Sequence, residues 1–395
     1  MQILRILKQN GPTSRIDIAN QLELTRAAVT IITNEMIQQG IIVEVGEYKH
    51  LSERAPRGRK KILIDINQSY RFILGIIIEE KFVGIGLSTL SGDVLDKRNF
   101  NISKETDYAE IMSFISISYG EILTNNCLEA HLILGIGLAV YPTMFSKMNV
   151  PAVHKSADFS TIKKSFSEFT SLPIVIDNSV KGTAMANIDF EKNFKKTRHY
   201  LAFLQYGESF NFVFANLHDP IISYDNRTNF VDNIIINPYS SEAPDSANRT
   251  GSVRAELTPS ATIQKAKRVY SKDSTPILYK ITSGNIDKVV LDTILDAYHK
   301  GEPKIAKLVA EWFDLFAVLI NNLVYSTGPQ RIVLHNFKMC EGSVVRIKET
   351  LNNIGGSEVA DIIMLSSIET KNRFLSGSAI AIRELFYNKG GFDIA

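Results

Sequence analysis

The stretch LELTRAAVTIITNEMIQQG, residues 22–40, decides the fold of the first part of this 395-residue chain. Thr25 is a candidate N-cap, because its hydroxyl can accept a hydrogen bond from the first turn of a helix, and Gly40 is placed to end that helix. The predicted apolar face recurs at helical spacing and consists of Val29, Ile32, Met36 and Ile37. The opposite face therefore carries small and polar side chains.

Two shorter helical patterns precede this helix. The first has an apolar stripe of Ile3, Leu4, Ile6 and Leu7, and it ends at Gly11-Pro12-Thr13. The second begins near Ser14 and has a stripe of Ile16, Ile18, Ala19 and Leu22. In a helix-turn-helix, the second helix enters the major groove of DNA and the first helix supports the second.

The outward face of the third helix carries residue types that read DNA. Arginine and asparagine form paired hydrogen bonds to guanine and adenine, and short side chains permit close approach to base edges. The candidate recognition residues are Thr25, Arg26, Ala27, Thr30 and Asn34. Ile31 departs from this pattern, because an aliphatic side chain there can only contact a thymine methyl group or pack on protein. The alternative is an ordinary three-helix bundle with a solvated face.

A basic loop, KHLSERAPRGRKK, follows between two β-rich runs, IIVEVGEY and ILIDI. Its candidate DNA contacts, to phosphates or to a minor groove, are Arg54, Arg57, Arg59 and Lys60. Residues 1–67 hold ten Lys or Arg against seven Asp or Glu, whereas the whole chain has a net charge of only +2. Local positive charge favours a polyanion partner. Charge alone suits a solvated loop equally well, but charge and pattern together predict a winged helix-turn-helix over residues 1–68.

Length and composition restrict the rest of the molecule. A chain of 395 residues predicts two or three globular units. No apolar run is long enough to span a membrane, and no secretory signal follows Met1, so we expect a cytoplasmic protein with no membrane partner. Cys127 and Cys340 are too far apart in sequence for a disulfide framework or a cysteine-rich metal site, and their apolar surroundings predict core thiols.

The order of segments resembles that of ROK-family transcriptional regulators, a family named for repressors, open reading frames and kinases. The resemblance begins with TSRIDIANQLELTRAAVTIITNEMIQQGIIVE and PRGRKKILIDINQSYRFILGI, and it continues through GIGLAVYPTMF, VIDNSVKGTAMAN and FLSGSAIAIRELF. It implies an actin-like or ribonuclease-H-like pair of α/β lobes after the winged unit. The first lobe is expected over residues 69–188, closed by a C-terminal helix over 376–395, and the second lobe, for dimerisation and effector binding, over 189–375.

The apolar runs support this architecture independently. Short strand candidates are FILGIII, VGIGL, LILGIGLAV, PIVI and YLAFLQ, and helical patterns separate or follow them. Such an arrangement is typical of an α/β fold. The fold alone does not decide the function, because one architecture hosts both catalytic and non-catalytic proteins.

The phosphate-binding motifs of the family kinases are replaced in this sequence. Their first turn, D-x-G-G-T, corresponds here to Ile77, Glu79, Glu80 and Lys81. Two carboxylates there would repel a triphosphate. Their second turn, G-x-G-x-G, keeps only Gly207, and His335 and Asn336 stand where glycines face the adenosine. The resemblance therefore implies no nucleotide cofactor.

The catalytic and zinc motifs are also altered. The family's Asn-Asp pair is Asn178-Ser179 here, and Asp177 lies one residue too early to act as the base. The family's E-x-G-H and cysteine-rich zinc motifs match a region in which Phe230 and Asn233 replace Glu and His, and Ser252 and Arg254 replace the last Cys and Glu. No cysteine lies between Cys127 and Cys340, so no zinc cofactor is expected.

Three functions remain open at this point. The first is a kinase-inactive regulator, most simply a repressor of carbohydrate-related genes, that binds double-stranded DNA as a homodimer or higher homo-oligomer. The second is a regulator that still binds a sugar or sugar phosphate as inducer, with Asn178, Asn233 and Arg254 as the remaining polar candidates of an effector cleft. The third is an active sugar kinase with an attached DNA-binding domain.

Overall fold

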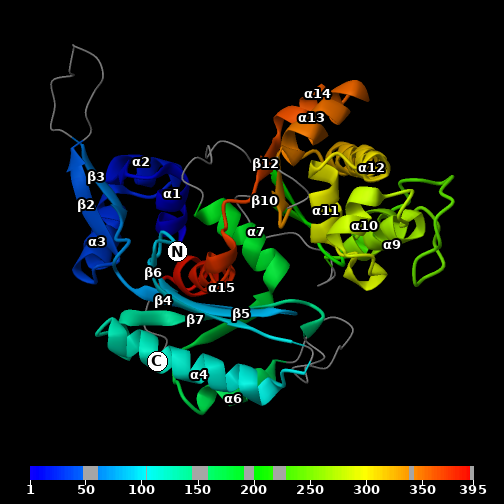
Figure 1. The fold of residues 1–395 in the computed structure, drawn as a ribbon. Helices are drawn as coiled ribbons and strands as arrows, with labels where there is room; N and C mark the ends of the chain where they lie inside the picture. Colours follow the sequence, from blue (N-terminus) through cyan, green and yellow to red (C-terminus); the bar gives the residue numbers. More distant parts are fainter. Residues whose placement is uncertain are drawn as a thin grey trace. The chain divides into compact units, whose positions relative to one another are not determined.

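The computed structural model describes residues 1–47, 61–103, 105–144, 159–190, 200–216, 228–337 and 342–391. The chain divides into two compact units (Figure 1). Unit 1 contains Met1–Thr197 and Ile368–Ala395, and unit 2 contains Arg198–Ser367. Unit 1 thus includes both the predicted winged unit and the predicted first lobe.

The winged unit contains the three predicted helices and the two predicted strands, and it adds one short strand, β1, that was not predicted. It consists of α1 (Gln2–Asn10), β1 (Thr13–Ser14), α2 (Arg15–Gln21), α3 (Arg26–Gln38), β2 (Ile42–Glu47) and β3 (Ile62–Ile66). The three strands form an antiparallel sheet in the order β1-β3-β2. Thr25 caps α3, since its hydroxyl accepts a hydrogen bond of 3.2 Å from the backbone nitrogen of Ala28. Gly40 follows the helix with a φ of 74°, a conformation that glycine adopts without strain. The predicted cap and stop are confirmed.

The inner face of α3 differs from the prediction at one position. Ile32 was expected in the core, but its side chain is exposed, and Thr33 is buried instead beside Val29 and Met36. The Thr33 hydroxyl is satisfied there, because it donates a hydrogen bond of 2.8 Å to the carbonyl oxygen of Val29. Thr33 is therefore buried at low cost, because its hydroxyl is hydrogen-bonded, although the apolar pattern predicted Ile32 in the core.

The expectation for Cys127 is also wrong. Cys127 is exposed and has a φ of 51°, in the turn that follows helix α4 (Tyr108–Asn125). Cys127 lies between Asn126 and Leu128, just after the helix ends, so it occupies a surface turn and not a core-facing segment. Cys340, the second cysteine, lies outside the described residues.

The first lobe is built on a five-stranded sheet in the order β6-β5-β4-β7-β8. Its strands are β4 (Phe72–Glu79), β5 (Phe82–Ser88), β6 (Val94–Asn101), β7 (Ile133–Val140) and β8 (Ile174–Asn178). Helices α4 and α6 (Ser160–Ser167) lie on one face of the sheet, and α7 (Ser179–Asp189) and α15 (Leu375–Ala381) lie on the other (Figure 1). The predicted strands of this lobe are confirmed, and α15 packs against β4 and β7.

The C-terminal helix lies unusually close to the sheet. A side chain at Gly137 of β7 would place its Cβ 1.9 Å from the carbonyl oxygen of Gly377 in α15, so neither position has room for one. After α15 the chain continues as a π-helical segment, η5 (Ile382–Asn388). Residues of η5 share a hydrophobic core with α1 and β3 of the winged unit.

Unit 2 contains a four-stranded sheet in the order β10-β9-β11-β12. The strands are β9 (Tyr200–Gln205), β10 (Asn211–Asn216), β11 (Arg331–His335) and β12 (Ile363–Leu365). The helices include α8 (Val253–Leu257), α9 (Pro259–Val269), α10 (Pro276–Ile281), α11 (Leu291–His299), α12 (Pro303–Thr327), α13 (Ser343–Asn353) and α14 (Ser357–Asp361). By length and composition α12 could cross a membrane, but 50% of its apolar window is buried, as in a core helix.

Candidate nucleic-acid interface

The predicted recognition residues all lie on the exposed side of α3 or at its cap. Thr25, Arg26, Ala27, Thr30 and Asn34 are exposed. The Thr30 hydroxyl donates a hydrogen bond of 2.7 Å to the carbonyl oxygen of Arg26, which fixes its rotamer along the helix. The face thus presents one guanidinium, one amide and several short side chains to the surroundings. The wing candidates Arg54, Arg57, Arg59 and Lys60 lie outside the described residues.

Arg15, at the start of α2, holds the recognition helix in place. Its Nε donates to the Thr33 hydroxyl at 3.0 Å, and its Nη2 lies 3.4 Å from Asn34 Oδ1 and 2.9 Å from Glu44 Oε1. One guanidinium therefore ties α2 to α3 and to strand β2, and it orients the Asn34 amide. Sequence reasoning missed Arg15, and its position as the first residue of the bracing helix was the only available signal.

A second ion pair joins the bracing helix to the wing strands. Ser14 caps α2, and Lys61, immediately after the wing loop, places its Nζ 2.9 Å from Asp17 Oδ1. The Ser14 hydrogen bond and the Lys61 charge hold the pKa of the Asp17 carboxyl below its ordinary value. Both Asp17 and Lys61 are substantially exposed, so the pair positions β3 more than it stabilises the fold.

The winged unit is joined to the first lobe by a cluster of charged side chains, which we call the anchor cluster: Lys8, Asp189 and Arg383. Lys8 Nζ lies 2.8 Å from Asp189 Oδ1, while Arg383 Nε and Nη2 donate to the two oxygens of the same carboxylate at 2.7 and 2.9 Å. The Asp189 and Arg383 side chains are only 5% and 11% exposed. Lys8 Nζ also lies 4.3 Å from the centre of the Tyr387 ring.

Burial and charge act in opposition in the anchor cluster. Burial alone raises the pKa of Asp189, but the nearby Arg383 and Lys8 outweigh it, and the net pKa lies below the ordinary value. Burial lowers the pKa of Lys8, and the Asp189 carboxylate offsets this only in part. The carboxylate is therefore stabilised as an anion by the two cations around it.

Apolar packing and further hydrogen bonds surround the anchor cluster. Residues of α1 and β3 share one hydrophobic core with residues of η5 and the first-lobe sheet. Arg5 Nη2 donates to Asn388 Oδ1 at 3.0 Å, and the Tyr70 hydroxyl donates to the carbonyl oxygen of Gly391 at 3.0 Å. The winged unit is thus packed on the first lobe and is not a tethered separate body.

The position of the family's first phosphate turn is occupied by an ion pair. Glu79, at the end of β4, is buried and its Oε2 accepts a hydrogen bond of 2.5 Å from Arg373 Nη1. Burial raises the pKa of Glu79, and Arg373 opposes this shift. Glu80 accepts a hydrogen bond of 2.7 Å from the Thr143 hydroxyl. Both carboxylates at this turn are therefore held by side-chain partners.

The three candidate effector residues lie in different settings. In unit 1, Asn178 is buried and caps α7, its side chain accepting a hydrogen bond of 2.8 Å from the backbone nitrogen of Val180. In unit 2, Asn233 is exposed at the end of the short helix η2 (Phe230–Asn233). Arg254 Nη2 is 2.6 Å from Asp232 Oδ2, a fully buried carboxylate. Asn233 and Arg254 thus belong to neighbouring elements of unit 2, while Asn178 belongs to unit 1.

Arg254 also lines a polar pocket of about 460 Å³ in unit 2, together with Glu208, Thr258, Gln264 and Arg268. The loop beside it is held by Asp245, which accepts hydrogen bonds from the backbone nitrogens of Ala247 and Arg249 and from the Ser252 hydroxyl. These contacts lower the pKa of Asp245 to about 2, against the effect of desolvation. Within the described residues, no group of three or more His, Cys, Asp or Glu side chains is placed to hold a metal ion.

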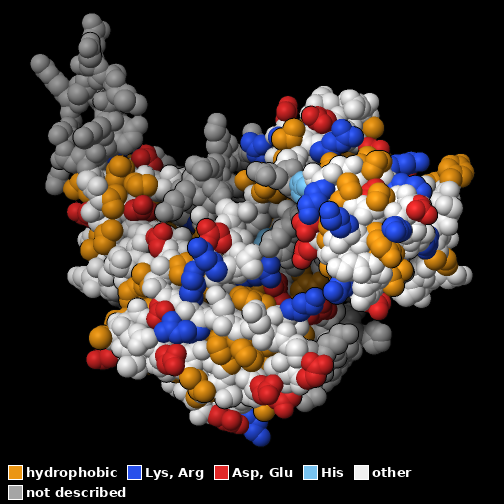
Figure 2. Space-filling model, in the orientation of Figure 1, with side chains coloured by type: hydrophobic (Ala, Val, Ile, Leu, Met, Phe, Trp, Pro, Cys, Tyr) orange, Lys and Arg blue, Asp and Glu red, His pale blue; other side chains and the backbone are white. Residues whose placement is uncertain are grey.

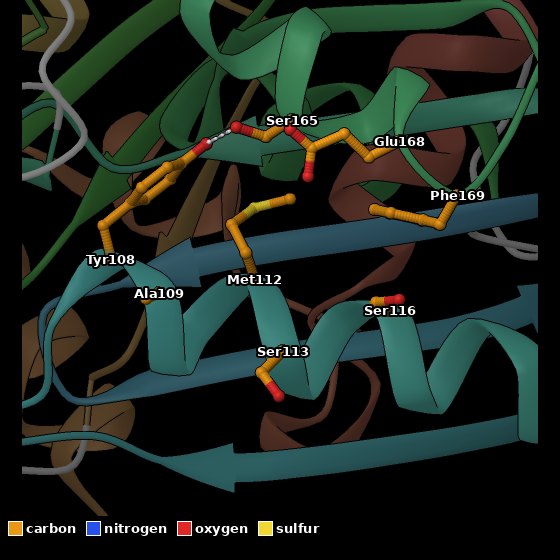
Figure 3. A pocket seen from close by; sticks show the side chains of 8 residues that line it. All are labelled: Tyr108, Ala109, Met112, Ser113, Ser116, Ser165, Glu168 and Phe169. Carbon is orange, nitrogen blue, oxygen red and sulfur yellow. Dashed lines mark hydrogen bonds between the residues drawn. The ribbon is translucent and has the colours of Figure 1, made fainter.

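A second pocket, of about 520 Å³, lies between α4 and α6 of the first lobe (Figure 3). Tyr108 donates a hydrogen bond of 3.0 Å to the Ser165 hydroxyl at one side of it, and the Met112 and Phe169 side chains point into it. None of the predicted functional residues lines this pocket.

Comparisons with known proteins agree with the winged unit. Residues 1–43 match the family described as winged helix-turn-helix DNA-binding. The putative xylose repressor of Caldicellulosiruptor sp. (strain Rt8B.4) is 24% identical over 185 residues, which cover 46% of this chain and 45% of that protein. The DNA-binding transcriptional dual regulator NagC of Escherichia coli (strain K12) is 30% identical over 105 residues, 26% of this chain and 24% of that protein. The matches span half or less of these curated relatives.

Solved structures resemble the chain over a longer range. The crystal structure of a ROK family transcriptional regulator, a homologue of the E. coli MLC protein, covers 98% of this chain and 95% of that chain, with a TM-score of 0.66 and 16% identity. The ROK hexokinase from Thermus thermophilus covers 81% of this chain and 100% of that chain, with a TM-score of 0.60 and 15% identity. These likenesses confirm the predicted fold class, a winged helix-turn-helix followed by a two-lobed α/β fold that regulators and sugar kinases share.

Proposed function

We propose that this chain, a homologue of ROK-family repressors, is a sequence-specific DNA-binding transcriptional regulator and acts as a repressor. The observation that carries this proposal is the outward face of α3, which offers a guanidinium, an amide and short side chains, in a winged helix-turn-helix. The domain bounds we propose are residues 1–68 for DNA binding, 69–188 with 376–395 for the first lobe, and 189–375 for the second.

The roles of the DNA-binding residues follow from their chemistry. Arg26 and Asn34 read guanine or adenine through paired hydrogen bonds, while Arg57 and Arg59 of the wing loop bind phosphates. A winged unit of this size covers one half-site, so we propose that a homodimer or higher homo-oligomer binds a palindromic operator in the cytoplasm.

The test compares the two sets of DNA contacts. Selection from a random duplex library with the full-length chain should yield a preferred sequence, and Arg26→Ala or Asn34→Ala should lose about 1–3 kcal/mol of that preference. The paired change Arg57→Ala with Arg59→Ala should instead weaken binding to all duplexes and reduce the dependence of affinity on salt. Equal losses from both sets would contradict the assigned roles.

We further propose that the two-lobed part is not a kinase. The Glu79–Arg373 ion pair at the phosphate turn and Ser179 in place of a carboxylate base support this proposal. Because the phosphate-binding glycines and the carboxylate base are replaced, neither ATP nor a sugar hydroxyl would be activated. No nucleotide, magnesium or zinc cofactor is therefore expected. Incubation with ATP, magnesium and a panel of hexoses should release ADP only at the background rate, and turnover above it would overturn the proposal.

A carbohydrate effector is the second candidate function. Curated relatives carry the names xylose repressor and N-acetylglucosamine repressor. The pocket at Arg254 has charged and hydroxyl groups that can hydrogen-bond a sugar or sugar phosphate. Asn178 and Asn233 are the other candidate contacts. A sugar that binds only the folded state raises the melting temperature, so a thermal-shift screen of sugars on wild-type protein and on Arg254→Met tests this candidate. A shift that Arg254→Met leaves intact would remove Arg254 from the site.

A further inference from the structure

Ile31 on the recognition helix α3 is a large exposed aliphatic side chain among the polar residues described above. Ile31 is 69% exposed, the largest exposure of any bulky apolar side chain in the described part of the winged unit. Figure 2 shows that hydrophobic side chains gather over the part of the surface where α3 and β2 lie. A surface aliphatic is common by itself, so its position on the helix has to decide its meaning.

Helical geometry places Ile31 at the outermost point of α3. The buried side chains Val29, Thr33 and Met36 define the direction of the core. At about 100° per residue, Ile31 points about 170° away from their mean direction. Ile31, and not Arg26 or Asn34, is therefore the side chain that a helix approaching a groove would push in first.

The neighbours of Ile31 along its own face of α3 are small or polar. On the helix surface its neighbours three and four positions away are Ala27, Ala28, Asn34 and Glu35. Two of these are alanines and two are polar, so none of the four is a second bulky aliphatic side chain. A protein interface would instead need contiguous apolar area around its central residue.

The major groove offers one apolar group, the C5-methyl of thymine. We propose that Ile31 packs against a thymine methyl group and thereby specifies thymine at one position of each half-site. The inference rests on the proposed DNA-binding function. Ala27, one helical turn earlier, is small enough to let the backbone approach the bases, and Arg15 holds α3 against α2 while it does so. Methyl packing would then add specificity at a base pair that no hydrogen bond needs to read.

A double-mutant cycle between protein and DNA tests this inference. The full-length chain first selects its preferred duplex from a random library. Each thymine of the selected half-site is then replaced by deoxyuridine, which removes only the methyl group. For the wild-type protein one such replacement should weaken binding about 4-fold, the effect of exposing a single methyl-sized group. For Ile31→Ala the same replacement should have no further effect.

The matched control is Ile32→Ala. Ile32 is also an exposed isoleucine, at 39%, but it lies on a different side of α3. Ile32→Ala should keep the full penalty for deoxyuridine. Circular dichroism and melting temperature should be unchanged for Ile31→Ala, because an outward side chain contributes little to stability.

The failure of the inference and the failure of the proposed function can be told apart. If the wild-type protein selects a sequence but no deoxyuridine penalty depends on Ile31, the inference is wrong and DNA recognition stands. A change in oligomeric state for Ile31→Ala, with the penalty retained, would likewise overturn it in favour of a contact between copies of the chain. If no duplex is selected at low salt, the proposed function is wrong and the inference falls with it.

Discussion

Helices α1 and α3 of the winged unit depart from the usual pattern of side-chain burial in opposite directions. Helix α1 places the ammonium group of Lys8 on a buried carboxylate, although charges are normally kept in water. Helix α3 exposes Ile31, although aliphatic groups are normally removed from water. Each exception marks the face by which its helix contacts something outside the winged unit. For α1 that partner is the first lobe, and for α3 we propose that it is DNA.

The difference between these helices should appear as two kinds of mutant. Residues of the anchor cluster should affect the stability of unit 1, because they hold two parts of it together. Residues on the outward face of α3 should affect binding without affecting stability. The comparison fails if both faces behave alike.

The largest expected effect is that of Asp189→Asn. This change keeps the shape of the side chain but leaves Lys8 and Arg383 without their counter-charge, which should lower the free energy of unfolding by about 3–5 kcal/mol. Urea denaturation measures the loss. The control is Asp17→Asn at the exposed pair with Lys61, where less than about 1 kcal/mol is expected. Equal losses from the two variants would mean that the anchor cluster does not join the winged unit to the lobe.

A smaller loss is expected for Thr33→Val on the inner face of α3. The valine would leave the Arg15 Nε without the acceptor that it now has at 3.0 Å, at a cost of about 1–3 kcal/mol in the free energy of unfolding. Thr30→Val is the matched control, because its hydroxyl donates only to Arg26 on the exposed side of the same helix. A neutral or stabilising Thr33→Val would show that its hydrogen bonds do not explain why threonine, and not Ile32, is buried.

The pH dependence of stability sharpens the first of these predictions. The folded-state pKa of Asp189 lies below the ordinary value of 3.8, so the carboxylate contributes stability above that pH and loses it as the pH falls. The difference in free energy of unfolding between wild type and Asp189→Asn should therefore be constant near neutral pH and shrink below about pH 4. Urea titrations of both proteins between pH 7 and about pH 3 measure it. A difference that grows on acidification would contradict the assignment.

The smallest change in stability is expected at the outward face of α3. Arg26→Ala and Asn34→Ala should each stay within about 0.5 kcal/mol of the wild-type free energy of unfolding. Both should nevertheless lose preference for the selected duplex. Parallel measurement of urea midpoints and of duplex binding by fluorescence anisotropy provides the check, and a variant that loses both together would place its residue in the fold instead of the interface.

Local patterns in the sequence predicted much of this fold. The Thr25 cap, the Gly40 stop and the apolar strands of both units depend on neighbours within a few residues, and these are visible in a sequence. The same patterns misplaced Ile32, which is exposed, and missed the buried Thr33, whose hydroxyl accepts a hydrogen bond from Arg15. The contact from Arg15 comes from helix α2, so the apolar pattern of α3 alone could not predict it.

The anchor cluster could not have been predicted from local patterns. Lys8, Asp189 and Arg383 come from three distant segments, each of which reads by itself as an ordinary charged helix surface. Only the tertiary arrangement brings them together and removes them from water. The exposed position of Cys127 was missed for a related reason, since its positive φ arises in the turn after α4, which the composition of the segment does not predict.

The attachment of the winged unit to η5 has a consequence during translation. Arg5 bonds to Asn388 and Lys8 reaches Asp189 beside Arg383, so helix α1 contacts a segment that is synthesised 383 residues after it. Until residues near 390 emerge, the nascent chain carries a winged unit with no support beneath it. The winged unit can therefore dock on the first lobe only after η5 has been synthesised. A messenger RNA truncated before this segment would produce polypeptides in which the winged unit has no fixed orientation on the lobe.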